Sequence, residues 1–204
     1  MSSDNIYNLF LNSGAVLHGH FILSSGLHSD YFVQCARVLE KSQNVQLLAS
    51  NIIREIHTSV NIQDVHYVIS PAVGGLIIGY EVARQIGSNF VFCERIDKKF
   101  SLEKRGFQIK PNSNCVIIED VVTTAGTSIE MINYLHSLGL NLNMCIEGCL
   151  VDRSGDVGTK NLQSVHVKLI SLLKLNIRTF YSDDIPDNLR NVPAVALGTK
   201  QRTY

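Results

Sequence analysis

The feature that most constrains the fold is the alternation of short apolar runs with longer segments of helical periodicity. Residues 115–118 are four consecutive apolar residues, which is typical of a strand buried on both faces of a parallel sheet. Residues 42–60 instead repeat their apolar side chains at helical spacing. Because parallel strands need a crossover connection, usually a helix, this alternation predicts an α/β fold with an open, mostly parallel sheet flanked by helices.

Period and length locate the individual elements. Gly87 and Gly139 follow two of the expected helices, where glycine readily adopts the left-handed conformation of a C-cap. Residues 119–127 are expected to form a loop. The strands are expected at 65–70, 90–93, 115–118, 144–151 and 165–173, and the helices at 42–60, 76–86 and 128–138.

The length of 204 residues suits one domain spanning residues 1–204. Residues 1–40 and 174–204 do not follow the alternation, and we expect them to form a small cap over one end of the sheet. No internal repeat or linker separates them from the core.

Charge and composition exclude several classes of protein. Eighteen basic residues balance eighteen acidic ones, whereas a non-specific nucleic-acid binder is expected to carry a basic excess. No stretch approaches the ~18 apolar residues of a membrane span, and the N-terminus lacks the pattern of a signal peptide. The five cysteines fit no common metal or disulfide spacing, so we expect reduced, buried thiols in a cytoplasmic protein without membrane or nucleic-acid partners.

The strongest functional signal lies at the end of the run 115–118. The acids Glu119 and Asp120 follow it, and after Val121 and Val122 come six small residues: Thr123, Thr124, Ala125, Gly126, Thr127 and Ser128. Ligands of open α/β sheets bind beyond the carboxyl ends of the strands, where N–H and hydroxyl donors at a helix start suit a phosphate. The acids suit a sugar that develops positive charge. A capped turn is the structural alternative, but it requires no acidic pair, so a phosphorylated ribose is favoured.

This segment resembles the phosphoribosyl-diphosphate-binding signature of type I phosphoribosyltransferases, a motif far more specific than an isolated G-x-G-x-x-G. The resemblance covers roughly residues 15–175 and points to the orotate phosphoribosyltransferases, in their shorter branch. It rests further on residues 19–32, 70–75, 104–107 and 150–153.

The resemblance implies transfer of a 5-phosphoribosyl group from 5-phospho-α-D-ribose 1-diphosphate to orotate, giving orotidine 5′-monophosphate and diphosphate in pyrimidine synthesis. It implies Mg²⁺ as cofactor, held mainly by the substrate, with a link to Asp120 through water. Catalytic roles fall on Lys99, Glu119 and Asp120. Contacts to phosphoribosyl diphosphate fall on Ala72, Val73, Gly74, Gly75, Arg95, Lys98, Lys99 and the residues from Glu119 to Thr127.

Two glycines directly after the strand 65–70 let a backbone approach a ligand closely. On the residues alone, Gly74 and Gly75 are equally consistent with an ordinary strand-to-helix turn, and the resemblance favours a diphosphate loop. Residues 95–110 carry six basic and two acidic side chains, a local charge of +4. This segment is expected to be a mobile lid, with a solvated β-hairpin as the alternative.

In the family, the corresponding lid closes over the neighbouring subunit's site and supplies a lysine to the departing diphosphate. The resemblance places that lysine at Lys99, with Lys98 as a close competitor, places the arginine at the strand end at Arg95, and implies a homodimer. It also implies that Arg153 and Thr123 contact orotate while Tyr31 and Phe32 border the base. On the residues alone, Arg153 would form an ion pair with Asp152 or Asp156, and the two aromatic residues would lie in the core.

The sequence departs from the better-studied branch in three places. Gly74 and Ser24 stand where that branch has lysines, and the lid lacks a histidine beyond its lysine. The diphosphate would then depend more on Mg²⁺, backbone N–H groups, Arg95 and Lys99. His18, His20 and His28 are expected to have structural or surface roles.

Three other functions compete with this one. The same chemistry on another base, such as uracil, would not use Arg153. A non-enzymatic nucleotide-sensing regulator would not need the charged lid. A dinucleotide-binding oxidoreductase is excluded because the glycine fingerprint with its downstream acid is missing.

Overall fold

The computed structural model describes residues 1–23 and 25–196, so Ser24 and the end of the predicted cap, residues 197–204, lie outside the described residues. The helices are α1 (Ser3–Asn12), α2 (Ala36–Leu39), α3 (Ser42–His57), α4 (Leu76–Ile86), α5 (Gly126–Ser137), α6 (Val157–Gln163) and α7 (Asp187–Arg190), with short 3-10 turns η1 (Ile62–Asp64) and η2 (Glu103–Arg105). The strands are β1 (Val16–Ile22), β2 (His28–Val33), β3 (Tyr67–Pro71), β4 (Asn89–Ile96), β5 (Lys99–Ser101), β6 (Asn114–Val122), β7 (Asn143–Asp152), β8 (Lys168–Lys174), β9 (Thr179–Phe180) and β10 (Val195–Ala196).

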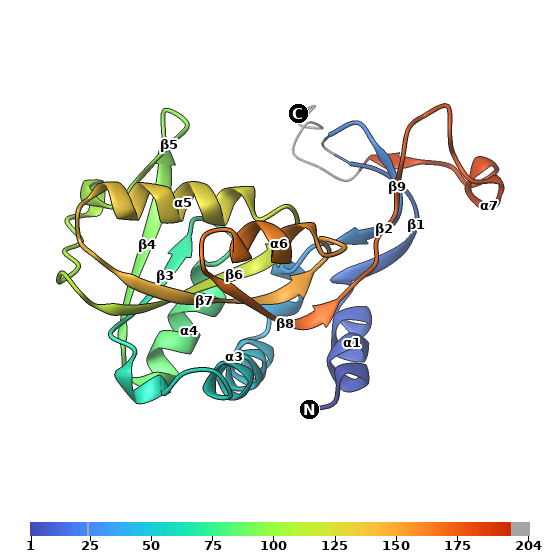
Figure 1. Cartoon of the computed structure of the whole chain (residues 1–204). Coiled ribbons are helices and arrows are strands. Elements are labelled where there is room, and N and C mark those ends of the chain that lie inside the picture. Colours follow the sequence, from blue (N-terminus) through green and yellow to red (C-terminus); the bar gives the residue numbers. More distant parts are fainter. Residues whose placement is uncertain (24, 197–204) are drawn as a thin grey trace.

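The main sheet has six strands in the order β5-β4-β3-β6-β7-β8. All neighbouring pairs are parallel except β4 and β5, which form an antiparallel hairpin. Helices α5 and α6 cover one face of the sheet, and α3 and α4 cover the other (Figure 1). The predicted α/β fold is confirmed.

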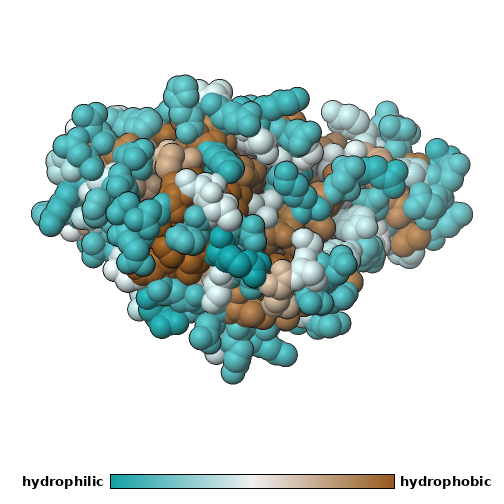
Figure 2. All heavy atoms as spheres, turned by 60° about the horizontal axis from the view of Figure 1, so that its bottom comes forward, coloured by the Kyte–Doolittle hydropathy of each residue, from teal (hydrophilic) through white to brown (hydrophobic). Residues whose placement is uncertain are grey.

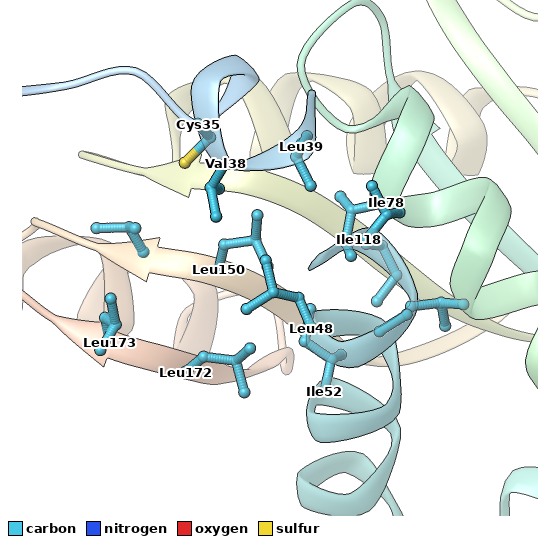
Figure 3. Close-up of a cluster of buried hydrophobic side chains, with 14 of the residues drawn as sticks. Cys35, Val38, Leu39, Leu48, Ile52, Ile78, Ile118, Leu150, Leu172 and Leu173 are labelled. Carbon is cyan, nitrogen blue, oxygen red and sulfur yellow. The ribbon is translucent and has the colours of Figure 1, made fainter. Parts of the chain in front are cut away.

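The core on the α3 and α4 side shows why these segments fold together. Ile52 of α3, Ile78 of α4 and Leu150 of β7 are completely buried, and their side chains meet between sheet and helices (Figure 3). Helix α4 ends where predicted, because Gly87 adopts a left-handed φ of 74° and its amide donates to the carbonyl of Ala83.

Strand β6 is longer than its apolar run. It was expected to end at Ile118, with residues 119–127 as a loop, and that boundary is wrong. Pairing with β7 continues to Val122 opposite Asp152, so both acids lie within the strand. Helix α5 correspondingly begins at Gly126, two residues before the predicted start.

The two termini build a second sheet of four strands in the order β10-β1-β2-β9. In Figure 1, strands β7 and β8 point toward this smaller sheet, which therefore lies beyond the carboxyl ends of these two strands. Residues 1–40 and 174–204 were expected to form a cap over one end of the main sheet. One part of the prediction is wrong: residues 3–12 form helix α1, whose Ile6 and Phe10 are buried in the core of the main sheet.

The cysteines and the helices match two expectations from the sequence, that the thiols are reduced and buried and that no segment could span a membrane. All five thiols are free, and four of them are buried. Among the residues that the structure describes, no helix combines the length and the apolar character that crossing a membrane demands.

Candidate active site

The acid pair sits at the end of the central strand β6, where the two carboxyl groups lie close enough to interact. Ile117, just before the pair, packs in the core under α5, and Ile118 packs in the core under α3 and α4. The amide of Asp120 donates to Oε1 of Glu119 (3.0 Å), and the amide of Val121 donates to Oδ1 of Asp120 (2.9 Å).

Burial distinguishes the two acids. Glu119 is only 8% exposed, and burial together with the neighbouring Asp120 raises the pKa of its carboxyl to about 10. Glu119 is therefore neutral at physiological pH in this structure. Asp120 is half-buried, so it is the more accessible of the two acids.

The threonine-rich loop wraps around the start of α5. Ala125 takes a left-handed φ of 61° and turns the chain into the helix. Thr123, Thr124, Gly126 and Thr127 are exposed, and they line a small polar hollow together with Glu119. The first N–H groups of a helix have no partner within it, so this hollow presents donors to an anion.

The loop from Ala72 to Gly75 reaches the same edge from the end of β3. A Cβ on Gly74 would lie 2.8 Å from Cγ of Asp120, and a Cβ on Gly75 would lie 2.6 Å from the carbonyl oxygen of Ile118. Both distances are closer than real Cβ atoms come. The structure thus brings the glycine loop into direct contact with the end of β6, and Val73 at its tip is 80% exposed.

Arg153 follows β7 at this edge, where its amide donates to the carbonyl of Val122 (2.9 Å). Its side chain is half-buried, and burial lowers the pKa of the guanidinium. The expected ion pair with Asp152 or Asp156 is not present in the described part of the chain. Asp152 instead accepts from the amide of Ser154 (2.9 Å).

Cys35 joins this group, although the sequence indicated only a buried thiol. It is 1% exposed, and its Sγ donates weakly to the carbonyl of Asp120 (3.8 Å). Burial and the acids Asp120 and Glu119 raise its pKa, whereas Arg153 opposes the rise, so the thiol lies among these side chains.

The charged segment 95–110 begins as a β-hairpin, which was the alternative to a lid. Arg95 forms an ion pair with Glu130 of α5 (2.7 Å) and lies 4.5 Å over the ring of Phe100. Lys98 and Lys99 are exposed at the tip. The hairpin lies at the sheet edge and extends past α5, on the other side of the view in Figure 1 from the smaller sheet. Its side-chain ion pairs are with Glu130 and Glu94, and none joins it to Asp120 among the described residues.

The two aromatic residues expected at the base lie on opposite faces of β2. Tyr31 packs against His18, with 4.2 Å between ring centroids, and touches the main core. Phe32 packs against Phe21 at 5.8 Å. The structure therefore does not bring Tyr31 and Phe32 together.

The three N-terminal histidines lie in the smaller sheet. His18 is exposed, and its Nε2 lies 3.0 Å from the hydroxyl of Tyr7. His20 is buried between the carbonyl of Val192 and Nδ1 of His28, at 2.8 and 2.7 Å.

Glu147, a buried acid in β7, was not predicted as a site residue from the sequence. It is 0% exposed and accepts a hydrogen bond from Ser128 of α5 at 2.7 Å. The signal was present as a lone charge within the expected strand 144–151.

The oxygen donors at this edge suit Mg²⁺ only in part. The described residues contain no group of three or more side chains that could hold a metal ion. Mg²⁺ commonly keeps its waters and uses one or two carboxylates plus substrate phosphates. Asp120, half-buried beside Gly74 at the end of β6, fits that pattern.

Comparison with known proteins agrees with this geometry. A family described as "Phosphoribosyl transferase domain" matches residues 37–171. An orotate phosphoribosyltransferase of Desulforamulus reducens is 38% identical over 203 residues, covering 100% of both chains, and one of Erythrobacter litoralis is 36% identical over 99% of this chain and 100% of its own. The crystal structure of orotate phosphoribosyltransferase from Aeropyrum pernix is similar with a TM-score of 0.72 at 25% identity, covering 83% of this chain and 93% of that one.

Proposed function

The chain belongs to the orotate phosphoribosyltransferases, and from this membership we infer that it transfers the 5-phosphoribosyl group of 5-phospho-α-D-ribose 1-diphosphate to orotate. The products are orotidine 5′-monophosphate and diphosphate, in pyrimidine synthesis. The observation that carries the proposal is the end of β6, where an acid pair leads directly into the threonine-rich start of α5.

The loop at the start of α5 binds the 5′-phosphate. The backbone N–H groups of Gly126, Thr127 and Ser128 occupy the first turn of the helix, where the helix dipole also favours an anion. The exposed hydroxyls of Thr124 and Thr127 add donors beside them.

Asp120 stabilises the positive charge that develops on the ribose as the bond to diphosphate breaks. A fixed carboxylate at that point needs no reorganisation during the reaction. Glu119 is neutral in the absence of ligand, so it acts first as an acceptor that fixes the backbone amide of Asp120.

The diphosphate lies over the exposed loop from Ala72 to Gly75, whose backbone N–H groups would face it, and Gly74 leaves room beside the loop for the carboxylate of Asp120. Arg95 would also reach the diphosphate after leaving Glu130. We propose Mg²⁺ as the cofactor, held mainly by the substrate and contacting Asp120 through water. When bound, the ion would neutralise the leaving group as a Lewis acid.

Arg153 holds the carboxylate of orotate. A guanidinium can bind a carboxylate through two parallel hydrogen bonds, and half-burial strengthens such a pair. In the described residues no acid competes for Arg153, which supports this role. Thr123 borders the same space from the end of β6, and Phe32 remains a proposed neighbour of the base.

We propose a homodimer in which the hairpin of one subunit serves the site of the other. Lys98 and Lys99 make no ion pair with any described residue, and the hairpin extends past α5 at the edge of the main sheet (Figure 1). The face that carries α3 and α4 exposes hydrophobic atoms (Figure 2), among them Ile77 at 52% and Tyr80 at 59% exposure. This apolar surface adjoins the diphosphate loop, and a second copy would cover it.

Mixing two inactive variants tests the shared site. Lys99→Ala removes the lysine, and Asp120→Asn removes the acid. Equal mixing should restore roughly a quarter of native activity, because half of the dimers are then mixed and each has one intact site. Absence of any restoration, with dimers present by sedimentation, would contradict sharing. Normal single-turnover rates in Lys99→Ala would move the role to Lys98.

The decisive experiment follows the loss of orotate absorbance in the presence of phosphoribosyl diphosphate and Mg²⁺. We expect turnover by the native chain and, in Arg153→Ala, a KM for orotate raised by roughly tenfold or more, as for a lost charged hydrogen bond. Turnover of uracil but not orotate would establish a different base as substrate.

We place the enzyme in the cytoplasm. Its five thiols are free, and a reducing compartment would keep them so.

A further inference from the structure

Glu147 is a carboxyl group in the middle of the main sheet. It lies on β7 between Ile117 of β6 and Leu169 of β8, and none of its surface is exposed. Burying a charged group is costly unless partners compensate for the lost water. Its Oε1 accepts from Ser128 at 2.7 Å, whereas its Oε2 is buried without a partner among the described residues.

The position of Ser128 connects this acid to the phosphate loop. Ser128 is the third residue of α5, 2% exposed, and lies in the turn whose N–H groups form the polar hollow. Glu147 therefore lies directly beneath the donors that face the hollow. Its ionised form would place a negative charge under a site for a phosphate, in surroundings that screen it poorly.

The surroundings of Glu147 bring the pKa of its carboxyl near neutral pH. Burial raises the pKa of its carboxyl to about 7, and the hydrogen bond from Ser128 opposes that rise. The titratable groups nearest to it are Glu119 of β6, itself neutral, and the buried thiol of Cys149 on β7. Helix α5 presents only Ser128, and Ile117 and Leu169 on the flanking strands are apolar.

Resting on the proposed function, we propose that Glu147 is a positioning residue of the 5′-phosphate site, which fixes the first turn of α5 through Ser128 and makes phosphate affinity fall as the carboxyl ionises. The sign follows from like charges. The neutral acid tolerates a bound phosphate, and the carboxylate repels it. Binding of the phosphate near neutral pH therefore takes up part of a proton on Glu147.

The test measures the affinity of the full chain for phosphoribosyl diphosphate by calorimetry from pH 6 to pH 9, without orotate. Because the ligand titrates too, each variant is compared with the native chain at the same pH. Glu147→Gln keeps an acceptor for Ser128 and removes the charge. The variant should bind phosphoribosyl diphosphate about as tightly as the native chain at pH 6 and roughly three- to tenfold more tightly than the native chain at pH 8.5.

Two further variants keep the proposal falsifiable. Ser128→Ala removes the bond that favours the ionised carboxyl, so the step in affinity should move to higher pH. Glu55→Gln removes an acid at the far end of α3 and should follow the native chain. The proposal would be overturned if the affinity of Glu147→Gln relative to the native chain did not change with pH. If Glu147→Gln does not fold, the proposal would be overturned if the fall in affinity of Ser128→Ala occurred at the same pH as in the native chain.

Failure of the proposed function looks different. In that case the native chain would neither bind phosphoribosyl diphosphate nor consume orotate at any pH.

Discussion

Two loops follow parallel strands at the same edge of the main sheet: residues 72–75 after β3 and residues 123–125 after β6. The first has glycines where a Cβ would collide with Asp120 or with the backbone of Ile118. In the second loop and the helix start beside it, threonines are exposed, and a Cβ on Gly126 would meet only Oγ1 of Thr124, at an ordinary 3.4 Å. The loop after β3 can pack against β6 only because its glycines lack side chains, whereas the loop after β6 is distinguished by the exposed polar side chains that it presents.

The largest effect is expected at Gly75. In Gly75→Ala the new Cβ meets backbone, which cannot rotate away, so the loop or β6 must shift. We expect a loss of about 2–3 kcal/mol in unfolding free energy, as for overpacking, and a loss of activity beyond the proportion of folded protein. Chemical denaturation and orotate turnover measure the two.

The matched change in the other loop is Gly126→Ala, which has room for its Cβ. Its stability should stay within ~1 kcal/mol of native, as for a change without a steric mechanism. Equal damage by both substitutions would remove the distinction between the loops.

The acid pair gives the next effect. Asp120→Asn should lower kcat by about 100-fold, because it removes the accessible carboxylate that we propose faces the ribose. Glu119→Gln replaces a group that is already neutral, since burial raises its pKa to about 10, and should lower kcat by much less. Steady-state kinetics at pH 7.5 measure both falls in kcat. A larger fall in Glu119→Gln than in Asp120→Asn would show that bound substrate ionises Glu119.

Gly74→Ala should act through Asp120. The new Cβ occupies the space of the Asp120 carboxylate, which must rotate away while the backbone remains in place. We expect roughly a tenfold fall in kcat, less than the complete loss of the charge, with nearly native stability. An unchanged kcat would mean that the position of this carboxylate does not matter.

The smallest effect is expected at Thr127, one exposed hydroxyl among several donors. Thr127→Val should raise KM for phosphoribosyl diphosphate by about three- to tenfold and leave kcat nearly unchanged, as for the loss of one hydrogen bond to a charged group. Thr58→Val, at the end of α3, serves as the control. A fall in kcat would place the hydroxyl at the reacting atoms instead.

The sequence predicted the parts of the fold that repeat a period. Helix α4 was predicted residue for residue, because its apolar spacing and Gly87 agree. The end of β6 was missed because Glu119 and Asp120 are polar, and only pairing with β7, distant in sequence, keeps them in the sheet. Helix α1 was missed because residues 1–40 were assigned to the cap as a block, whereas Ile6 and Phe10 pack in the main core.

The candidate site also has parts that the sequence predicts and parts that it does not. The loop at the start of α5 could be located because its residues are contiguous in the sequence. The contacts of Gly74 with Asp120 and of Glu147 with Ser128 join separate segments, and no local pattern predicts them. Tyr31 and Phe32, both expected to border the base, pack against different rings, Tyr31 against His18 and Phe32 against Phe21, and their contact with a base stays a prediction.

The central place of β6 has a consequence for local opening of the chain. Strands β3 and β7 pair with it on both sides, whereas the hairpin of β4 and β5 ends at an open edge with its lysines in water. Amide hydrogen exchange follows such differences in protection, so the amides of β6 should exchange among the slowest and those of the hairpin tip among the fastest. We therefore expect the acids to lie in a strand that opens rarely and the lysines to lie in a hairpin that opens often.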